Sequence, residues 1–124
     1  MKNVKEILII DDDNRNIFAL SAVLNAKNYQ CISAMSASAG LKILSSNENI
    51  GVVLMDMMMP EMDGYEAIRK IKSDHLLKDI PVIAITAQAM TGDREKCIDA
   101  GAFGYISKPV DVDKLLQLLN QLID

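Results

Sequence analysis

The chain has few of the residues from which disulfide frameworks and zinc sites are built. Among its 124 residues there are only two cysteines, Cys31 and Cys97, and they lie far apart in the sequence. Two distant cysteines provide neither several disulfides nor the closely spaced ligand pairs of a zinc knuckle. We therefore expect two free thiols and a reducing, cytoplasmic compartment.

Positive charge and long apolar runs are also scarce. The chain has 13 Lys and Arg residues against 17 Asp and Glu residues, which gives a formal net charge of −4. This balance excludes the basic surface that binds nucleic-acid phosphates. No apolar run approaches the roughly 20 residues of a membrane span, and the N-terminus lacks a signal-peptide pattern. We expect neither nucleic acid nor membrane among the partners of this segment.

Glycine-rich phosphate-binding loops are missing as well. Neither G-x-G-x-x-G nor G-x-x-x-x-G-K-[ST] occurs in the sequence, so the backbone cradle that these loops form around nucleotide phosphates is absent. ATP is therefore not expected to be a direct phosphate donor. A phosphoryl group would come from an activated small molecule or from a protein side chain.

The sequence does contain a regular alternation of strand-like and helix-like segments. Apolar runs of strand length occupy residues 7–10, 30–34, 51–55, 82–85 and 105–106. Apolar residues at helical spacing occupy residues 15–26, 36–44, 65–72, 92–100 and 112–122. Residues suited to helix termini stand between them, with Asn14, Ser36 or Ser38, and Asp111 as N-caps and Gly101 as a C-cap.

Five strands that alternate with five helices predict βαβ units, a parallel sheet and helices on both of its faces. The continuous apolar character of several strands agrees, because such strands are covered on both sides. No linker, repeat or change in composition divides the chain. We therefore expect residues 1–124 to form one doubly wound α/β domain.

Polar residues follow the strands of this predicted sheet. Asp11 and Asp12 come after the first strand, Asp56 after the third, Thr86 after the fourth and Lys108 after the fifth. Parallel α/β sheets bind ligands at the carboxyl ends of their strands. The sequence thus predicts one crevice that contains acids, a hydroxyl and an ammonium group.

Carboxylates gathered at one sheet edge repel each other by roughly 3 kcal/mol per close pair at an effective dielectric constant of about 20. A hard divalent cation normally neutralises such a cluster, so we expect a Mg²⁺ site at Asp12 and Asp56, with Asp11 holding a metal-bound water. An oxygen of Asp56 is then free to attack phosphorus and form an aspartyl phosphate. Lys108 and Thr86 can stabilise the charge on the transferred group.

Four motifs, in this order and spacing, carry a family resemblance: ILIIDDD, VLMDMMMPEMDG, ITA and GYISKP. Together they resemble the response-regulator receiver domain of two-component signalling, and the resemblance covers essentially the whole chain. It implies a flavodoxin-like fold, with five parallel strands in the order 2-1-3-4-5 and five helices. It also implies that Asp56 accepts phosphate from a histidine kinase or a histidine phosphotransferase.

The resemblance assigns roles to the other residues of the site. The acidic pair Asp11 and Asp12 would bind Mg²⁺, helped by the backbone carbonyl of Met58. Thr86 would hydrogen-bond the phosphoryl group, and Lys108 would form an ion pair with it. Asp13, the third acid of the run, matches no ligand.

The resemblance also implies a switch. Tyr105 would move between outward and inward rotamers as Thr86 is drawn toward phosphate, which would remodel the face of the fourth helix, fifth strand and fifth helix. That face would contact a downstream protein target, and the surplus leucines of the last helix are compatible with a dimer contact there. The Lys108–Pro109 peptide bond matches one that is cis in receivers.

Two further features concern the lifetime of the phosphate and the context of the domain. Met58 and Gln88 occupy the two positions that tune phosphate hydrolysis in receivers, and we expect slow to moderate self-dephosphorylation. The segment 90–95 resembles receivers fused to histidine kinases. The chain is therefore either a receiver that acts alone or part of a hybrid kinase.

Three other functions remain open at this point. An aspartyl-phosphate hydrolase would use Asp11 as its nucleophile, because the Asp11-Asp12-Asp13-Asn14 run imitates D-x-D-x-[TV], although Arg15 stands where Thr or Val is needed. A flavin-binding electron carrier would need a hydroxyl-rich phosphate loop where this chain has acids. A degenerate receiver would bind proteins without phosphorylation. The interpretation we favour is a phosphoacceptor switch and not a turnover enzyme.

Overall fold

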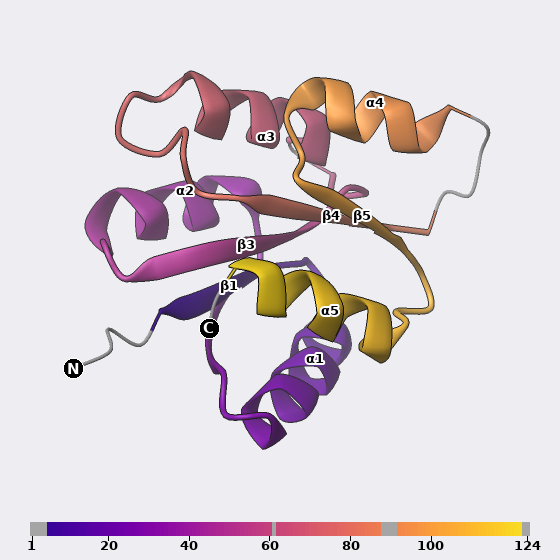
Figure 1. Ribbon diagram of the computed structural model, residues 1–124. Helices are drawn as coiled ribbons and strands as arrows, with labels where there is room; N and C mark the ends of the chain where they lie inside the picture. The colour runs from indigo at the N-terminus through magenta and orange to yellow at the C-terminus, as the bar shows by residue number, and fades with distance from the viewer. Residues whose placement is uncertain (1–4, 61, 88–91, 123–124) are drawn as a thin grey trace.

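The computed structural model describes residues 5–60, 62–87 and 92–122. Strands and helices alternate along these residues (Figure 1). The elements are β1 (Glu6–Ile10), α1 (Asn14–Ala26), β2 (Gln30–Ala34), α2 (Ala37–Ser46), β3 (Ile50–Asp56), α3 (Gly64–Ser73), β4 (Val82–Thr86), α4 (Asp93–Ala100), β5 (Gly104–Ser107) and α5 (Val112–Leu122).

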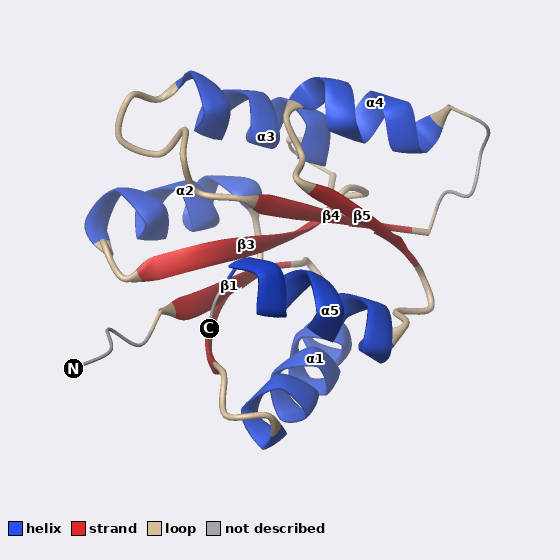
Figure 2. Cartoon of the chain, in the orientation of Figure 1, coloured by secondary structure: helices blue, strands red, loops and turns tan. Residues whose placement is uncertain are grey.

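The strands form one parallel sheet in the order β2-β1-β3-β4-β5 (Figure 2). Parallel strands place all their carboxyl ends along one edge, and the strand order reverses between β1 and β3. That reversal is where doubly wound sheets bind ligands. The predicted fold class, strand order and number of helices are confirmed.

Helices cover both faces of the sheet. In Figure 1, α1 and α5 lie on one side of it, and α2, α3 and α4 lie on the other. Alternate residues of β3 point to opposite faces: Val52 and Leu54 pack with α1 and α5, whereas Val53 and Met55 pack with the other three helices. The period-2 alternation of a strand thus divides the apolar core into two layers.

The N-terminus of α1 differs from the prediction. The N-cap is Asp13 and not Asn14, which is already the first helical residue. The Asp13 N–H donates to Asp11 Oδ1 at 2.8 Å, and this tight turn after β1 leaves Asp13 in extended backbone geometry. The Asp13 carboxylate is then free to accept from the Arg15 N–H at 2.9 Å. Both residue types cap helices well, so the turn decides which of them does so.

Other helix termini agree with the sequence. Ser36 caps α2 by accepting from the Ala39 N–H at 3.1 Å, which resolves the choice between Ser36 and Ser38. Asp111 accepts from the Lys114 N–H at 3.2 Å at the start of α5. Gly101 ends α4 with a φ of 119°, in the left-handed region that favours glycine.

None of the helices in the described ranges could cross a membrane. The longest of them, α1, has 13 residues, whereas a span takes roughly 20 apolar residues.

Burial in the two layers should determine how much each leucine contributes to stability. Leu24 of α1 is 0% exposed, whereas Leu76 is 86% exposed. We expect Leu24→Ala to lower the free energy of unfolding by about 2–5 kcal/mol, because it leaves a cavity. The matched control Leu76→Ala should change it by less than about 0.5 kcal/mol. Urea unfolding of both variants measures the difference, and equal losses would contradict this account of the core.

Candidate functional site

Three carboxylates gather at the point where the strand order reverses. One oxygen from each of Asp11, Asp12 and Asp56 lies within 4.8 Å of the other two. The pairing of β1 with β3 explains this. Ile10 lies opposite Met55, and the residues that follow them in the chain are Asp11 and Asp56. Asp11 and Asp56 are 3% and 4% exposed, and Asp12 is exposed. The predicted convergence of these acids is present in the structure.

Asp56 is held from several sides. Its Oδ1 accepts a hydrogen bond from the Met58 N–H at 3.1 Å and lies 3.7 Å from Lys108 Nζ. The pKa of Asp56 is raised to about 6, mainly by burial. The hydrogen bond from Met58 lowers this pKa, the charge of Asp11 raises it, the charge of Lys108 lowers it, and the charge of Asp12 makes a smaller contribution that raises it. Burial therefore outweighs the nearby cation. Near neutral pH the carboxylate is ionised, with little margin.

Lys108 reaches the carboxylates from beyond β5. Its Nζ lies 3.8 Å from Asp11 Oδ2 and 3.7 Å from Asp56 Oδ1. Its backbone N–H donates to the carbonyl of Thr86 at 2.7 Å, which ties the residue after β5 to the end of β4. The Lys108–Pro109 peptide bond is cis, as the family resemblance implies. One ammonium thus serves two buried carboxylates and is 27% exposed at its side chain.

Thr86 lies at the predicted edge. It ends β4 and is completely buried, one residue beyond Ile85, which lies opposite Asp56. Tyr105 lies one strand further out, opposite Ala84, and packs against the core layer under α4. Thr86 and Ala84 share a sheet face because they are two residues apart. Thr86 and Tyr105 therefore lie on the same side of the sheet.

The loop after β3 is shaped by its contact with α3. Met57 is buried, and a Cβ at Gly64 would lie 2.8 Å from Met57 Cα, so the start of α3 packs directly on this loop. Met58 is 49% exposed and contributes its N–H to Asp56; the metal-binding role of its carbonyl remains a prediction. Gln88, the other predicted determinant of phosphate lifetime, lies outside the described residues.

Asp13 stands apart from the other two acids of its run. It caps α1 and lies 3.3 Å from Arg15 in an exposed ion pair. Hydrogen bonds from the Arg15 side chain and backbone lower the pKa of Asp13. Its carboxylate is thus engaged with the helix and not with the cluster.

Sequence reasoning missed one buried acid. Asp93, the first residue of α4, is 6% exposed and accepts hydrogen bonds from Tyr65 and Tyr105. An acid in the first turn of a helix is ordinarily explained by the helix dipole, so its position alone gave no signal. The helical spacing of α4, which places Asp93 and Cys97 on one buried face, was the available clue.

A groove opens beside the carboxylate cluster, between α1 and the start of α5. Its volume is about 600 Å³. Asp11 and Lys108 line one end, and apolar side chains that include Leu20, Val23 and Val110 line the rest. The groove therefore borders the site at Asp11 and Lys108, while Asp56 lies outside its lining.

Comparison with known proteins decides the family. The family model for the response regulator receiver domain matches residues 7–120. This chain belongs to that family. The "Polar-differentiation response regulator DivK" of Brucella ovis is 33% identical over 119 residues, which is 96% of each chain. The receiver domain of a signal transduction histidine kinase from Syntrophus aciditrophicus is 30% identical, with a TM-score of 0.86 over 95% of this chain and 89% of that one.

A further structure supports the fold alone. A response regulator receiver protein from Pseudomonas putida superposes with a TM-score of 0.90 at 24% identity, and the match covers 98% of this chain and 99% of that one. The receiver family is a signalling family. The carboxylate cluster lies at the acidic edge that the receiver motifs identified.

The raised pKa of Asp56 predicts a pH-dependent stability. In the folded protein this pKa rises from 3.8 to about 6, so ionisation disfavours folding. We expect Asp56→Asn to be more stable than the wild type at pH 7 by about 1–2 kcal/mol, allowing for partial solvent screening.

Because folding raises the pKa of Asp56, the stability difference between Asp56→Asn and the wild type depends on pH. At pH 4, close to the ordinary carboxyl pKa of 3.8, the advantage of Asp56→Asn should be small; it should grow as the pH rises toward 6 and be complete above that. Urea unfolding of both proteins in a chelator, at pH 4 and pH 7, measures it. The same difference at both pH values would contradict the assignment.

Proposed function

We propose that this receiver domain is a phosphorylation-dependent switch in which Asp56 accepts a phosphoryl group from a phosphohistidine. The donor would belong to a histidine kinase or a histidine phosphotransferase. The observation that carries the proposal is the carboxylate cluster: Asp56 is buried at the switch point of the sheet, beside Asp11, Asp12 and Lys108. Membership of the receiver family supports the reaction class.

The reaction needs an ionised nucleophile. With a pKa of about 6, the Asp56 carboxylate is mostly charged at neutral pH. One of its oxygens attacks phosphorus, a P–O bond forms, and the P–N bond to the donor imidazole breaks with its electron pair going to nitrogen. Since Asp56 Oδ1 accepts from the Met58 N–H, Oδ2 is the oxygen best placed to attack.

The residues of the cluster fit a magnesium ion. Asp11, Asp12 and Asp56 supply the hard oxygen ligands that Mg²⁺ prefers, and the Met58 carbonyl is the proposed fourth protein ligand. When bound, Mg²⁺ would neutralise charge on the carboxylates and on the phosphoryl oxygens. Lys108, already 3.7 Å from Asp56, would pair with a phosphoryl oxygen. The Thr86 hydroxyl would donate to another.

The output would be conformational. Phosphate would draw Thr86 and allow Tyr105 to turn inward, which alters the face formed by α4, β5 and α5. Two apolar residues on the α4 side, Ile98 and Phe103, are 41% and 46% exposed. A downstream protein target or a second copy of the domain would bind this face. The domain assists its own phosphorylation and slow dephosphorylation, in the cytoplasm, and turns over no other substrate.

The context of the domain remains a proposal with two forms. It acts alone, or it belongs to a hybrid kinase; the similar receiver domain from Syntrophus aciditrophicus is part of a signal transduction histidine kinase. In the second form the phosphate passes between domains of one protein. In both forms the phosphoryl group reaches Asp56 from histidine.

Acetyl phosphate tests the phosphoacceptor. With Mg²⁺ present, we expect the intact protein to gain the mass of one phosphoryl group, and peptide mapping should place it on Asp56. Asp56→Asn should abolish the gain because no nucleophile remains. Asp11→Asn should slow it and leave Asp56 as the modified residue. Modification at Asp11 would support the hydrolase alternative, and an unmodified wild type would exclude the proposed function.

Substitutions of two neighbouring acids, Asp12 and Asp13, test the proposed magnesium site. We expect Asp12→Asn to weaken Mg²⁺ binding roughly tenfold, which corresponds to about 1.4 kcal/mol, because it removes a cluster carboxylate. Asp13→Asn is the matched control: Asp13 caps α1, and asparagine also caps helices, so the affinity should not change. Calorimetric titration with MgCl₂ measures both. Equal losses in the two variants would indicate a nonspecific charge effect and not a site.

A further inference from the structure

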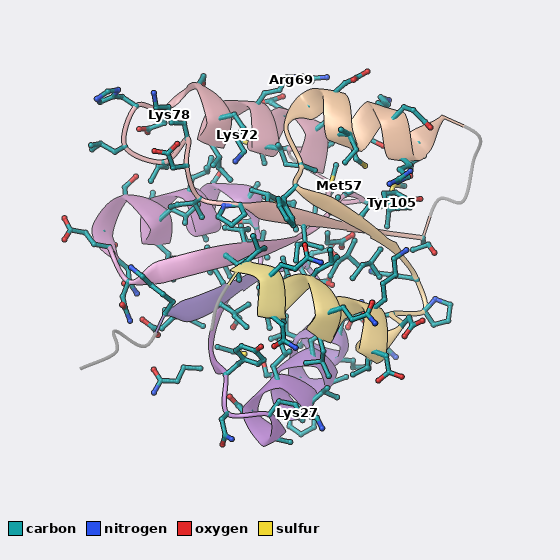
Figure 3. All side chains as sticks on the ribbon, in the orientation of Figure 1. Lys27, Met57, Arg69, Lys72, Lys78 and Tyr105 are labelled. Atoms are coloured by element: carbon teal, nitrogen blue, oxygen red, sulfur yellow. The ribbon has the colours of Figure 1, made fainter. Side chains whose placement is uncertain are left out.

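The group formed by Tyr65, Asp93 and Tyr105 lies outside the carboxylate cluster and ties three elements together. The Tyr65 hydroxyl donates to Asp93 Oδ1, and the Tyr105 hydroxyl donates to Asp93 Oδ2 at 3.1 Å. Asp93 is buried at 6% exposure. Each of its two oxygens therefore has a phenol donor, one from α3 and one from β5. Figure 3 shows Tyr105 on the side of β5 that faces α4.

The environment of the group keeps both phenols protonated. Burial and the hydrogen bond to Asp93 raise the pKa of Tyr65 and that of Tyr105. Lys96 lies 4.4 Å from the centre of the Tyr65 ring and packs over it, a cation–π contact that further fixes this ring. Tyr65 is thus the anchored donor, and Tyr105, whose side chain is only partly buried, is the donor that can leave.

The group is connected to the phosphoacceptor through the backbone. Tyr65 follows Gly64, which packs on Met57, the residue after Asp56. On the other side, Tyr105 lies opposite Ala84 on the sheet face that also carries Thr86. Asp93 therefore stands between the loop that follows the phosphoacceptor and the tyrosine that is expected to move.

We propose that Asp93 is a positioning residue that restrains the switch. Its carboxylate, held by Tyr65, retains Tyr105 against α4, and the inward movement of Tyr105 toward Thr86 breaks the bond from its hydroxyl to Asp93 Oδ2. This inference rests on the proposed function of Asp56. A contact made only in the resting conformer lowers the population of the switched conformer, and so weakens the apparent affinity of the site for a phosphoryl group.

The test uses beryllofluoride, a mimic of the bound phosphoryl group, with saturating Mg²⁺. We expect Asp93→Asn and Tyr105→Phe each to tighten beryllofluoride binding by roughly five- to thirtyfold, the order expected for losing one hydrogen bond. Asparagine keeps one acceptor oxygen, which the anchored Tyr65 occupies, so both changes remove the charge-assisted bond from Tyr105. The double variant should therefore bind no tighter than either single variant. Asp99→Asn, an exposed acid on the same helix, is the matched control and should bind like the wild type.

A second measurement reports the ring itself. The chain has three tyrosines and no tryptophan, so 3-fluorotyrosine labelling should give three ¹⁹F resonances, which Tyr→Phe variants assign. In the wild type, beryllofluoride should move the Tyr105 resonance. In Asp93→Asn, this resonance should already be displaced toward that position without ligand.

The outcomes separate the two proposals. If the wild type shows neither beryllofluoride binding nor a shift, the proposed function fails and the restraint fails with it. If the wild type responds but Asp93→Asn binds with unchanged or weaker affinity, only the restraint is overturned. Effects of Asp93→Asn and Tyr105→Phe that add in the double variant would also overturn it, because they would then act through different contacts.

Discussion

The parallel pairing of β1 with β3 is the constraint on which the rest of the site depends. It brings Asp11 beside Asp56 at an edge where both are nearly inaccessible to water. Three carboxylates face one ammonium there, so the folded chain carries a local excess of negative charge that water cannot fully screen. The surrounding core, which is buried on both sheet faces, holds these groups together.

Most of the fold could be predicted because its signals are local. Apolar runs such as residues 7–10 and 82–85 are too short for helices and are covered on both sides, which is typical of parallel strands. The convergence of Asp11, Asp56 and Lys108 followed from a general rule about parallel sheets, without any knowledge of distances. The roles of Asp56 and Lys108 were first argued from their chemistry, and the family resemblance implied the same roles; they remain predictions.

The N-cap of α1 and the burial of Asp93 could not be predicted, because both depend on contacts that form only in the folded chain. The N-cap of α1 is Asp13 because a hydrogen bond to Asp11 turns the chain one residue earlier than the cap preferences alone indicate. The burial of Asp93 depends on two tyrosines, one 28 residues before it and one 12 residues after it. Contacts of this kind appear only when α3, α4 and β5 have been packed together.

Neighbouring residues of β5 pack in different core layers. Alternation along β5 places Ile106 in the layer under α1 and α5, and Tyr105 in the layer under α4. Lys108, beyond the end of the same strand, reaches the buried carboxylates. In the proposed switch, a change of charge at Asp56 would reach α4 through Tyr105, while Ile106 would keep β5 in place. A movable side chain on a fixed strand is a physical means of converting local charge into a changed surface, since packed cores resist continuous deformation.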